Sequence, residues 1–134
     1  MKVIKFKGKR IDNNEWVYGD LVHINGRSLI YHAPSKSTNQ SEILEANAID
    51  LLKSEASVVY DDSVGQFTGV CDKNGNEIYE GDRVMIEYSN ETMLGQVFWR
   101  NFICAWCIRI DNGASECTTQ ISKRLTEMCC KVIN

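Results

Sequence analysis

Three Asn-Gly dipeptides, Asn25-Gly26, Asn74-Gly75 and Asn112-Gly113, divide this 134-residue chain into short segments that are rich in apolar residues. Asn-Gly is a strong signal for a two-residue type I′ turn, because both central residues of that turn need a positive φ. A looser Asn13-Asn14 turn adds a fourth hairpin, and the chain contains a single proline. Repeated tight turns with so little proline predict antiparallel β structure.

Each turn also predicts which residues face each other across its hairpin. The expected opposed pairs are Ile11 with Trp16, His23 with Ser28, Val70 with Tyr79, and Cys71 with Ile78. The last Asn-Gly turn is expected to join a strand over residues 102–111 to one over 114–121. A further sharp turn at Gly81-Asp82 is expected to lead into a strand over residues 84–88.

Residues 34–57 interrupt the hairpin pattern. A polar loop over residues 34–41 precedes apolar residues at helical spacing, behind a sequence that resembles a capping box. The residues concerned are Asn39, Glu42, Ile43, Leu44, Ala48, Leu51 and Leu52. The expected architecture is therefore mainly β with one short helix. An N-terminal antiparallel sheet lobe over residues 1–57 and a small Src-homology-like β-barrel over residues 58–134 are expected to form one compact unit.

The charge of the chain limits the possible ligands. A net charge of −3 at pH 7 argues against non-specific binding of nucleic acid, which needs a basic surface. The first ten residues are an exception, and Lys5, Lys7 and Lys9 are the candidate anion-contacting side chains. We favour the alternative that these lysines protect an edge strand, because charges on an edge prevent it from pairing with other sheets.

Aromatic side chains supply the candidate interaction surface, which consists of Trp16, Tyr18, Phe98, Trp99 and Trp106. The expected strand over residues 16–24 is apolar on both faces. Such a strand is either buried between layers or lies at an interface. We therefore hypothesise a homo-oligomer or a docking surface for another protein, with a thick two-layer core as an equally weighted alternative.

The segment Cys104-Ala105-Trp106-Cys107 has the CxxC spacing of zinc knuckles and redox dithiols. Its apolar flanks predict a strand, in which the two cysteines point to opposite faces. A redox pair would need a helix N-terminus, and zinc would need further ligands, for which Cys117 and Cys129 or Cys130 are available in principle. Buried free cysteines are the favoured interpretation, so we expect neither a metal nor a cofactor.

No catalytic residue is expected. His23 and His32 lie apart along their hairpin, and neither has a nucleophile at a recognisable spacing. Glu77, Glu80 and Asp82 surround the second sharp turn, where paired carboxylates are able to act in acid–base chemistry or to bind a divalent cation. Acidic residues are also ordinary beside a tight turn, and we favour that interpretation. An enzyme is thus the least favoured class.

Residues 64–84, together with Glu15-Trp16-Val17-Tyr18-Gly19-Asp20, resemble the YopX family of phage and prophage proteins. The shared elements are a basic first strand, a Trp-Val-Tyr-Gly element, a Val-Gly-Gln-Phe-Thr-Gly block and a Glu-Gly-Asp turn. Cys71 and Ser63 depart from the usual charged residue and threonine, and the chain ends at Asn134, where similar proteins tend to continue with a tail. The resemblance implies a mobile-element origin and a β fold, and it brings no catalytic residue.

Three classes of function follow from these observations. The leading hypothesis is a non-enzymatic, oligomerising interaction protein that docks onto a host or phage protein. The alternatives are a module that sequesters a nucleotide-like small molecule in an aromatic pocket, and a small barrel that binds single-stranded nucleic acid by stacking. No apolar export signal or membrane span is visible, so we expect a protein in the cytoplasm of the host cell, with reduced cysteines.

Overall fold

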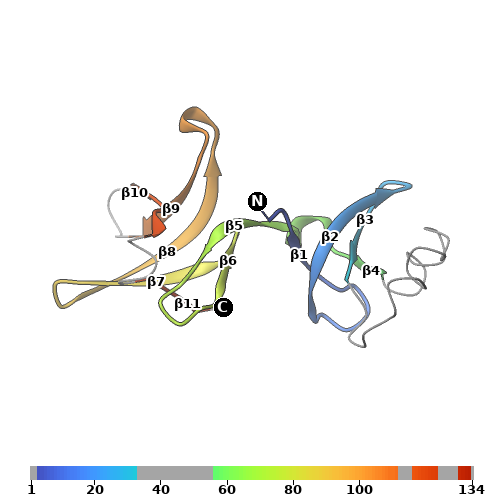
Figure 1. Cartoon of the computed structure of the whole chain (residues 1–134), viewed down its shortest axis with the longest axis horizontal. Coiled ribbons are helices and arrows are strands. Elements are labelled where there is room, and N and C mark those ends of the chain that lie inside the picture. The colour runs from blue at the N-terminus through green and yellow to red at the C-terminus, as the bar shows by residue number, and fades with distance from the viewer. Residues whose placement is uncertain (1–2, 33–55, 112–115, 124–129, 134) are drawn as a thin grey trace. The chain divides into compact units, whose positions relative to one another are not determined.

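The protein is described by a computed structural model over residues 3–32, 56–111, 116–123 and 130–133. These residues form eleven strands and two 3₁₀ turns (Figure 1), so the prediction of a mainly β fold is confirmed. The chain divides into two compact units, one over residues 4–65 and one made largely of residues 66–134. The helix predicted after residue 39 lies outside the described residues.

Four strands build the N-terminal unit: β1 (Phe6–Lys9), β2 (Trp16–Ile24), β3 (Arg27–Tyr31) and β4 (Ala56–Val59). They pair antiparallel in the order β4-β3-β2-β1. One face of this sheet forms a small core, in which Ile30 and Val59 are buried. Gly8 packs directly on Val59, since a Cβ at Gly8 would lie 2.8 Å from the Val59 Cγ2.

This sheet curls far enough for its first and last strands to meet. Three contacts join them: Arg10 bridges Val59, the Tyr60 N–H donates to the Lys9 carbonyl at 2.9 Å, and the Ile11 N–H donates to the Val58 carbonyl at 3.1 Å. The 3₁₀ turn η1 (Asp61–Ser63) follows directly. The end of β1 is therefore hydrogen-bonded to the end of β4, in addition to the pairing of β1 with β2.

The β2–β3 hairpin confirms the prediction made from Asn25-Gly26. These two residues have φ angles of 51° and 73°, as a type I′ turn requires. His23 lies opposite Ser28 in the expected register. Local turn chemistry was thus sufficient to predict this hairpin.

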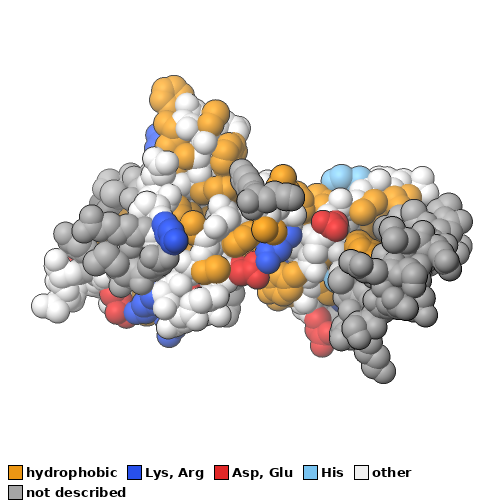
Figure 2. All heavy atoms as spheres, viewed as in Figure 1, with side chains coloured by type: hydrophobic (Ala, Val, Ile, Leu, Met, Phe, Trp, Pro, Cys, Tyr) orange, Lys and Arg blue, Asp and Glu red, His pale blue; other side chains and the backbone are white. Residues whose placement is uncertain are grey.

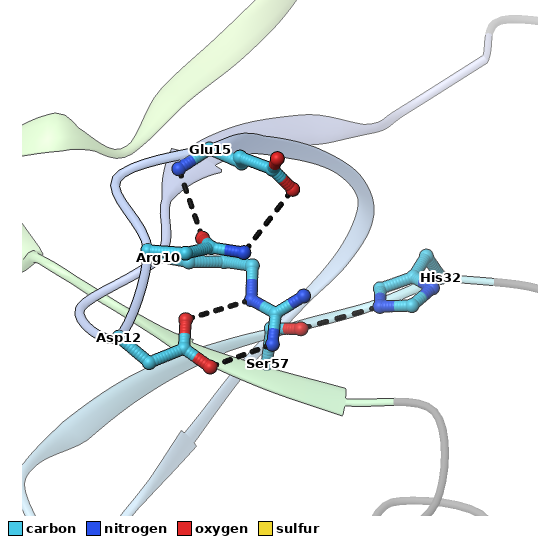
Figure 3. Close-up of polar contacts among 6 residues, drawn as sticks. Arg10, Asp12, Glu15, His32 and Ser57 are labelled. Carbon is cyan, nitrogen blue, oxygen red and sulfur yellow. Dashed lines mark hydrogen bonds and ion pairs between the residues drawn. The ribbon is translucent and has the colours of Figure 1, made fainter.

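The turn between β1 and β2 differs from its prediction. Lys9, not Ile11, lies opposite Trp16. The loop is longer than the predicted turn and is closed by side-chain hydrogen bonds (Figure 3). The Asn13 side chain accepts the Glu15 N–H at 3.0 Å, and the Arg10 guanidinium donates to the Asp12 carboxylate at 2.7 Å. Ile11 is left 46% exposed at the end of the sheet.

Seven strands follow: β5 (Gly65–Cys71), β6 (Glu77–Tyr79), β7 (Arg83–Tyr88), β8 (Glu91–Arg100), β9 (Ala105–Asp111), β10 (Glu116–Gln120) and β11 (Cys130–Val132). β5 pairs with β6, and the last five form an antiparallel sheet in the order β10-β9-β8-β7-β11. Among the described residues no ladder joins β10 to β11. Closure into a Src-homology-like barrel therefore stays a prediction.

The core of this unit is a continuous apolar cluster on one face of the five-stranded sheet. Its buried members are Ile78, Val84, Ile86, Val97, Ile108, Ile110 and Cys130. Gly95 lies within this face, and a Cβ there would come within 2.4 Å of the Ile108 Cγ2. The glycine thus lets β8 and β9 pack closely across their shared core face.

The prediction of a type I′ turn at Asn74-Gly75 is wrong. Asp72 closes a three-residue loop, since its N–H donates to Asn76 at 2.8 Å and its carbonyl accepts from Gly75 at 3.0 Å. Only Gly75 takes a positive φ, of 82°. Phe67 rather than Val70 faces Tyr79, because the register also shifts between Phe67 and Cys71. At the turn itself, Cys71 faces Glu77 rather than Ile78. The side chain of Asp72 causes the shift, because its carboxylate accepts the Asn74 and Asn76 N–H groups.

Two further strand predictions need correction. β9 begins at Ala105, because Phe102 and Ile103 belong to the 3₁₀ turn η2 (Asn101–Ile103). Asp111 pairs with Glu116 rather than with Ala114, so the connection there is longer than the two-residue turn expected. The strand predicted over residues 84–88 is confirmed as part of β7. β7 is followed by a two-residue turn at Ser89-Asn90, which was not predicted because it contains no Asn-Gly pair.

The sequence blocks that carried the family resemblance are architectural. In the Gln-Phe-Thr-Gly block, Gly69 has a φ of 91° and the Thr68 hydroxyl donates to the Ile78 carbonyl at 2.8 Å. These features form the irregular register between β5 and β6. In the Glu-Gly-Asp turn, the buried Asp82 carboxylate accepts the Tyr79 N–H at 2.8 Å. The contacts of Thr68, Gly69 and Asp82 thus shape the chain in these two blocks.

Candidate interaction surfaces

The β8–β9 hairpin projects from its unit and carries exposed apolar side chains at its end (Figures 1 and 2). Phe102 is 90% exposed, Ile103 44% and Trp99 41%. Trp99 on β8 lies opposite Trp106 on β9, and their rings meet edge to face with centroids 5.0 Å apart. We call Trp99, Arg100, Phe102 and Ile103 the hairpin tip.

Contacts from Cys104 to Asn101 close the turn at the end of the hairpin. Cys104 adopts the left-handed region, with φ and ψ both at 50°, and its N–H donates to the Asn101 carbonyl at 3.2 Å. The Cys104 Sγ contacts the same carbonyl at 3.4 Å. The closed turn places Phe102 at the end of the hairpin, where its side chain is 90% exposed.

Among the C-terminal members of the predicted aromatic surface, Trp99 and Trp106 lie together and Phe98 lies apart from them. Trp106 packs against the core, while Trp99 is part of the hairpin tip. Phe98 lies on the opposite face of β8, where the Arg109 guanidinium covers its ring at 4.6 Å. Phe102, the most exposed of these aromatic residues, was missed because the apolar pair Phe102-Ile103 was interpreted as part of a strand.

In the N-terminal unit, the lysines of β1 and the aromatic residues of β2 lie on one face. Lys9 is opposite Trp16 and Lys7 is opposite Tyr18. The Lys7 Nζ lies 4.4 Å and the Lys9 Nζ 5.9 Å from the Trp16 ring centroid, within cation–π range. Trp16 and Tyr18 remain 41% and 51% exposed, whereas Lys7 is only 6% exposed. Lys5 lies half-buried just before β1.

The CxxC cysteines do not meet. Cys104 is exposed in the turn, whereas Cys107 is buried in β9 with its Sγ 3.8 Å from the Ala105 carbonyl. Across the described residues, no three His, Cys, Asp or Glu side chains group closely enough to hold a metal ion. Cys71 and Cys130 are also free thiols, and Cys130 belongs to the apolar core.

Each histidine has a serine partner, of which Ser28 was predicted opposite His23 but Ser57 was not predicted beside His32. The Ser28 hydroxyl lies 3.3 Å from the His23 Nδ1. The Ser57 hydroxyl lies 3.2 Å from the His32 Nε2 (Figure 3). Both serines are buried, at 3% and 8% exposure. A nucleophile must reach its substrate, so we interpret these pairs as hydrogen bonds that satisfy buried hydroxyl groups.

The carboxylates around Gly81 have different surroundings and do not share a partner. Asp82 is buried and bonded to the backbone, and Glu77 accepts the Tyr79 hydroxyl at 3.2 Å. Burial raises the pKa of Glu80 above its ordinary value of 4.5. Such a carboxyl opposes folding when it ionises, so its unfavourable effect grows as the pH rises through the unfolded-state pKa and then the folded-state pKa.

Replacing Glu80 with glutamine is therefore expected to raise the Tm at pH 7 and to have little effect at about pH 3, where both states hold the proton. Thermal melts at the two pH values measure this difference. The exposed Glu91→Gln is the control, with an expected Tm near that of the parent protein at both pH values. A Glu80→Gln variant that is less stable at pH 7 would show that the carboxylate makes a favourable contact.

Comparisons with known proteins identify one family. A family model described as YopX protein matches residues 5–129, which is nearly the whole chain. No curated protein matches the chain. Within the described residues, no helix has the length and apolar character needed to cross a membrane.

Proposed function

This chain belongs to the YopX protein family, and we propose that it is a phage- or prophage-encoded, non-enzymatic protein that oligomerises and docks onto a host or phage protein. The proposal places this activity at the hairpin tip. The observation that carries it is the 90% exposure of Phe102 at the end of a closed, projecting turn. Burying such a side chain contributes about 1.5–3 kcal/mol, which is a typical anchor contribution in a protein interface.

The composition of the hairpin supports the same proposal. Residues 92–110 contain no aspartate, glutamate or lysine, and their charged residues are Arg100 and Arg109. The centres of protein interfaces are enriched in aromatic residues and arginine and depleted in lysine and carboxylates. The same segment contains Phe98, Trp99, Phe102 and Trp106. The exposed residues Trp99, Arg100 and Phe102 of this segment are thus of the types that are enriched at interfaces.

The first test is the oligomeric state of Phe102→Ser, measured by native mass spectrometry and light scattering. We expect the parent protein to form an oligomer, and the variant to shift toward monomer at equal concentration. Its unfolding free energy is expected to change by less than about 0.5 kcal/mol, because the side chain is exposed. Leu94→Ser is the matched control, since Leu94 is 41% exposed on the same strand but away from the tip. A monomeric parent protein, or equal masses for parent and Phe102→Ser, would contradict the proposal.

A second candidate function is favoured by the convergence of Lys7 and Lys9 on Trp16. Sequestration of a nucleotide-like molecule needs cationic and aromatic groups together, and Trp16 and Tyr18 keep exposed ring surface beside the lysines. If this function holds, protein purified gently from its host carries a small bound molecule in native mass spectra, and Trp16→Ala loses it. Spectra that contain only the mass of the polypeptide would exclude this candidate.

A further inference from the structure

Two Asn-Gly pairs lie in turns within the described residues, Asn25-Gly26 and Asn74-Gly75. An Asn-Gly pair is chemically labile, because the backbone nitrogen of the glycine is able to attack the side-chain carbonyl carbon of the asparagine. Glycine has no Cβ that shields this nitrogen. All four residues are exposed, so exposure does not distinguish the two pairs, but their backbone hydrogen bonds do.

The Gly26 N–H stands outside the hydrogen-bond ladder of its hairpin. In a two-residue type I′ turn, the closing hydrogen bond joins the two flanking residues, which here are Ile24 and Arg27. Gly26 lies between them, and its N–H has no acceptor among the described residues. A Cβ built on Gly26 would meet nothing within 4 Å, so the space beside this pair is open.

The Asn74-Gly75 pair is bonded to Asp72 through both of its N–H groups. The Gly75 N–H donates to the Asp72 carbonyl at 3.0 Å. The Asn74 N–H donates to the Asp72 carboxylate at 2.9 Å. To attack Asn74, the Gly75 nitrogen must leave its acceptor and give up its proton. The same dipeptide is thus hydrogen-bonded in one turn and open in the other.

We propose that Asn25 is a site of spontaneous deamidation and that the hydrogen bonds to Asp72 protect Asn74 from the same reaction. The Gly26 nitrogen loses its proton and forms a bond to the Asn25 Cγ. The Cγ–Nδ2 bond breaks, Nδ2 leaves as ammonia, and a cyclic succinimide remains. Water then adds to either carbonyl of the ring and opens it, which leaves aspartate or isoaspartate at position 25. This reaction needs only water and is independent of the proposed function.

The two products differ in their effect on the β2–β3 hairpin. Both add one negative charge to a chain whose net charge is −3. Aspartate is compatible with the turn, because Asp-Gly also favours type I′. Isoaspartate inserts an additional carbon atom into the main chain, so the spacing that pairs Ile24 with Arg27 is lost. Aged protein is therefore expected to contain two modified forms that differ in this hairpin.

Peptide mapping of the folded, full-length protein tests this inference. The protein is incubated for days in mildly alkaline buffer made with isotopically labelled water, and the peptides that contain Asn25 and Asn74 are compared by mass spectrometry. Incorporated label identifies deamidation that occurred during the incubation. We expect Asn25 to react at least about tenfold faster than Asn74, because the hydrogen bonds to Asp72 must open before Asn74 reacts.

Protein kept unfolded in concentrated urea is the matched control, because it contains the same two dipeptides without their turns. There we expect Asn25 and Asn74 to react at similar rates. Asn25→Asp provides the aspartyl product as a standard and is expected to fold like the parent protein. A rate ratio in the folded protein equal to that in urea overturns this inference, as does an Asn25 that stays unmodified when folded.

The chemical form of the product tests the role of Gly26. Attack by the Gly26 nitrogen yields isoaspartate as well as aspartate, whereas direct hydrolysis of the side-chain amide yields aspartate alone. We expect isoaspartate at position 25, and we expect Gly26→Ala to slow the reaction both in the folded protein and in urea, because the methyl group shields the nitrogen. Aspartate as the sole product, or an unchanged rate in Gly26→Ala, would show that this nitrogen does not attack.

Discussion

Asp72→Ala is expected to destabilise the C-terminal unit by about 3 kcal/mol or more, the largest effect of any side-chain truncation that we predict. The Asp72 carboxylate is 3% exposed and binds two separate segments. One oxygen accepts the Asn74 and Asn76 N–H groups at 2.9 and 2.8 Å, and the other accepts the Val132 N–H at 2.9 Å. The truncation leaves these three N–H donors without their acceptor. Urea denaturation measures the loss.

Asp72→Asn separates the two tasks of this side chain. Its amide oxygen is able to accept the N–H groups of the turn, while its NH₂ group then faces the Val132 N–H, and two donors repel. We expect the turn to survive and β11 to lose protection in hydrogen exchange. The control is Glu87→Ala, which removes an exposed 3.4 Å pair with Lys73 and should cost less than about 1 kcal/mol. If Asp72→Ala costs as little as Glu87→Ala, this carboxylate does not fasten β11.

The contribution of Asp72 has a defined pH dependence. Burial alone would raise its pKa, but the N–H donors of Val132, Asn76 and Asn74 lower it below its ordinary value of 3.8. A carboxyl whose folded-state pKa is depressed stabilises the protein fully above the unfolded-state pKa. That stability is lost as the pH falls through the lower folded-state pKa. The difference between the parent protein and Asp72→Ala is thus expected to be constant above about pH 5 and to shrink below about pH 4.

The same residue shows why the register could be predicted only in part. Asn25-Gly26 formed the expected type I′ turn, because the φ preferences of two adjacent residues decide it. At Asn74-Gly75 the carboxylate of Asp72 binds the turn's own N–H groups, so Asn74 does not take a positive φ. The contact from Asp72 to Val132 spans 60 residues. A prediction made from the Asn-Gly dipeptide alone does not take account of a hydrogen-bond partner so far away in the sequence.

The candidate site was predictable to a similar extent. Trp99 was singled out by its aromatic surroundings and lies partly exposed near the end of the hairpin, and the apolar character of the hairpin was visible. Phe102 was assigned to a strand because its neighbours are apolar, and that assignment hid its position at the apex of a turn. The turn depends on Cys104 adopting a left-handed conformation, at φ of 50°. Non-glycine residues reach that region infrequently, so the sequence carried little signal for it.

Gly19→Ala is expected to disrupt the N-terminal unit, at a cost of about 3 kcal/mol or more. A Cβ at this position would lie 1.8 Å from the Tyr31 carbonyl oxygen and 3.2 Å from the His32 Cα. These are backbone atoms, so no change of side-chain rotamer relieves the clash. Gly19 pairs with Phe6, and the next residue, Asp20, pairs with Tyr31. The substitution must therefore separate β2 from its neighbours.

Gly26→Ala is the matched control, because it places the same methyl group in open space. Gly26 has a φ of 73°, and a Cβ there would meet nothing within 4 Å, so the expected cost is only the conformational strain, about 1–2 kcal/mol. Urea denaturation followed by circular dichroism compares the two variants. Equal losses would mean that β3 shifts freely to admit the methyl group. A much larger loss for Gly19→Ala would show that this glycine holds Trp16 and Tyr18 in the register that places them beside Lys9 and Lys7.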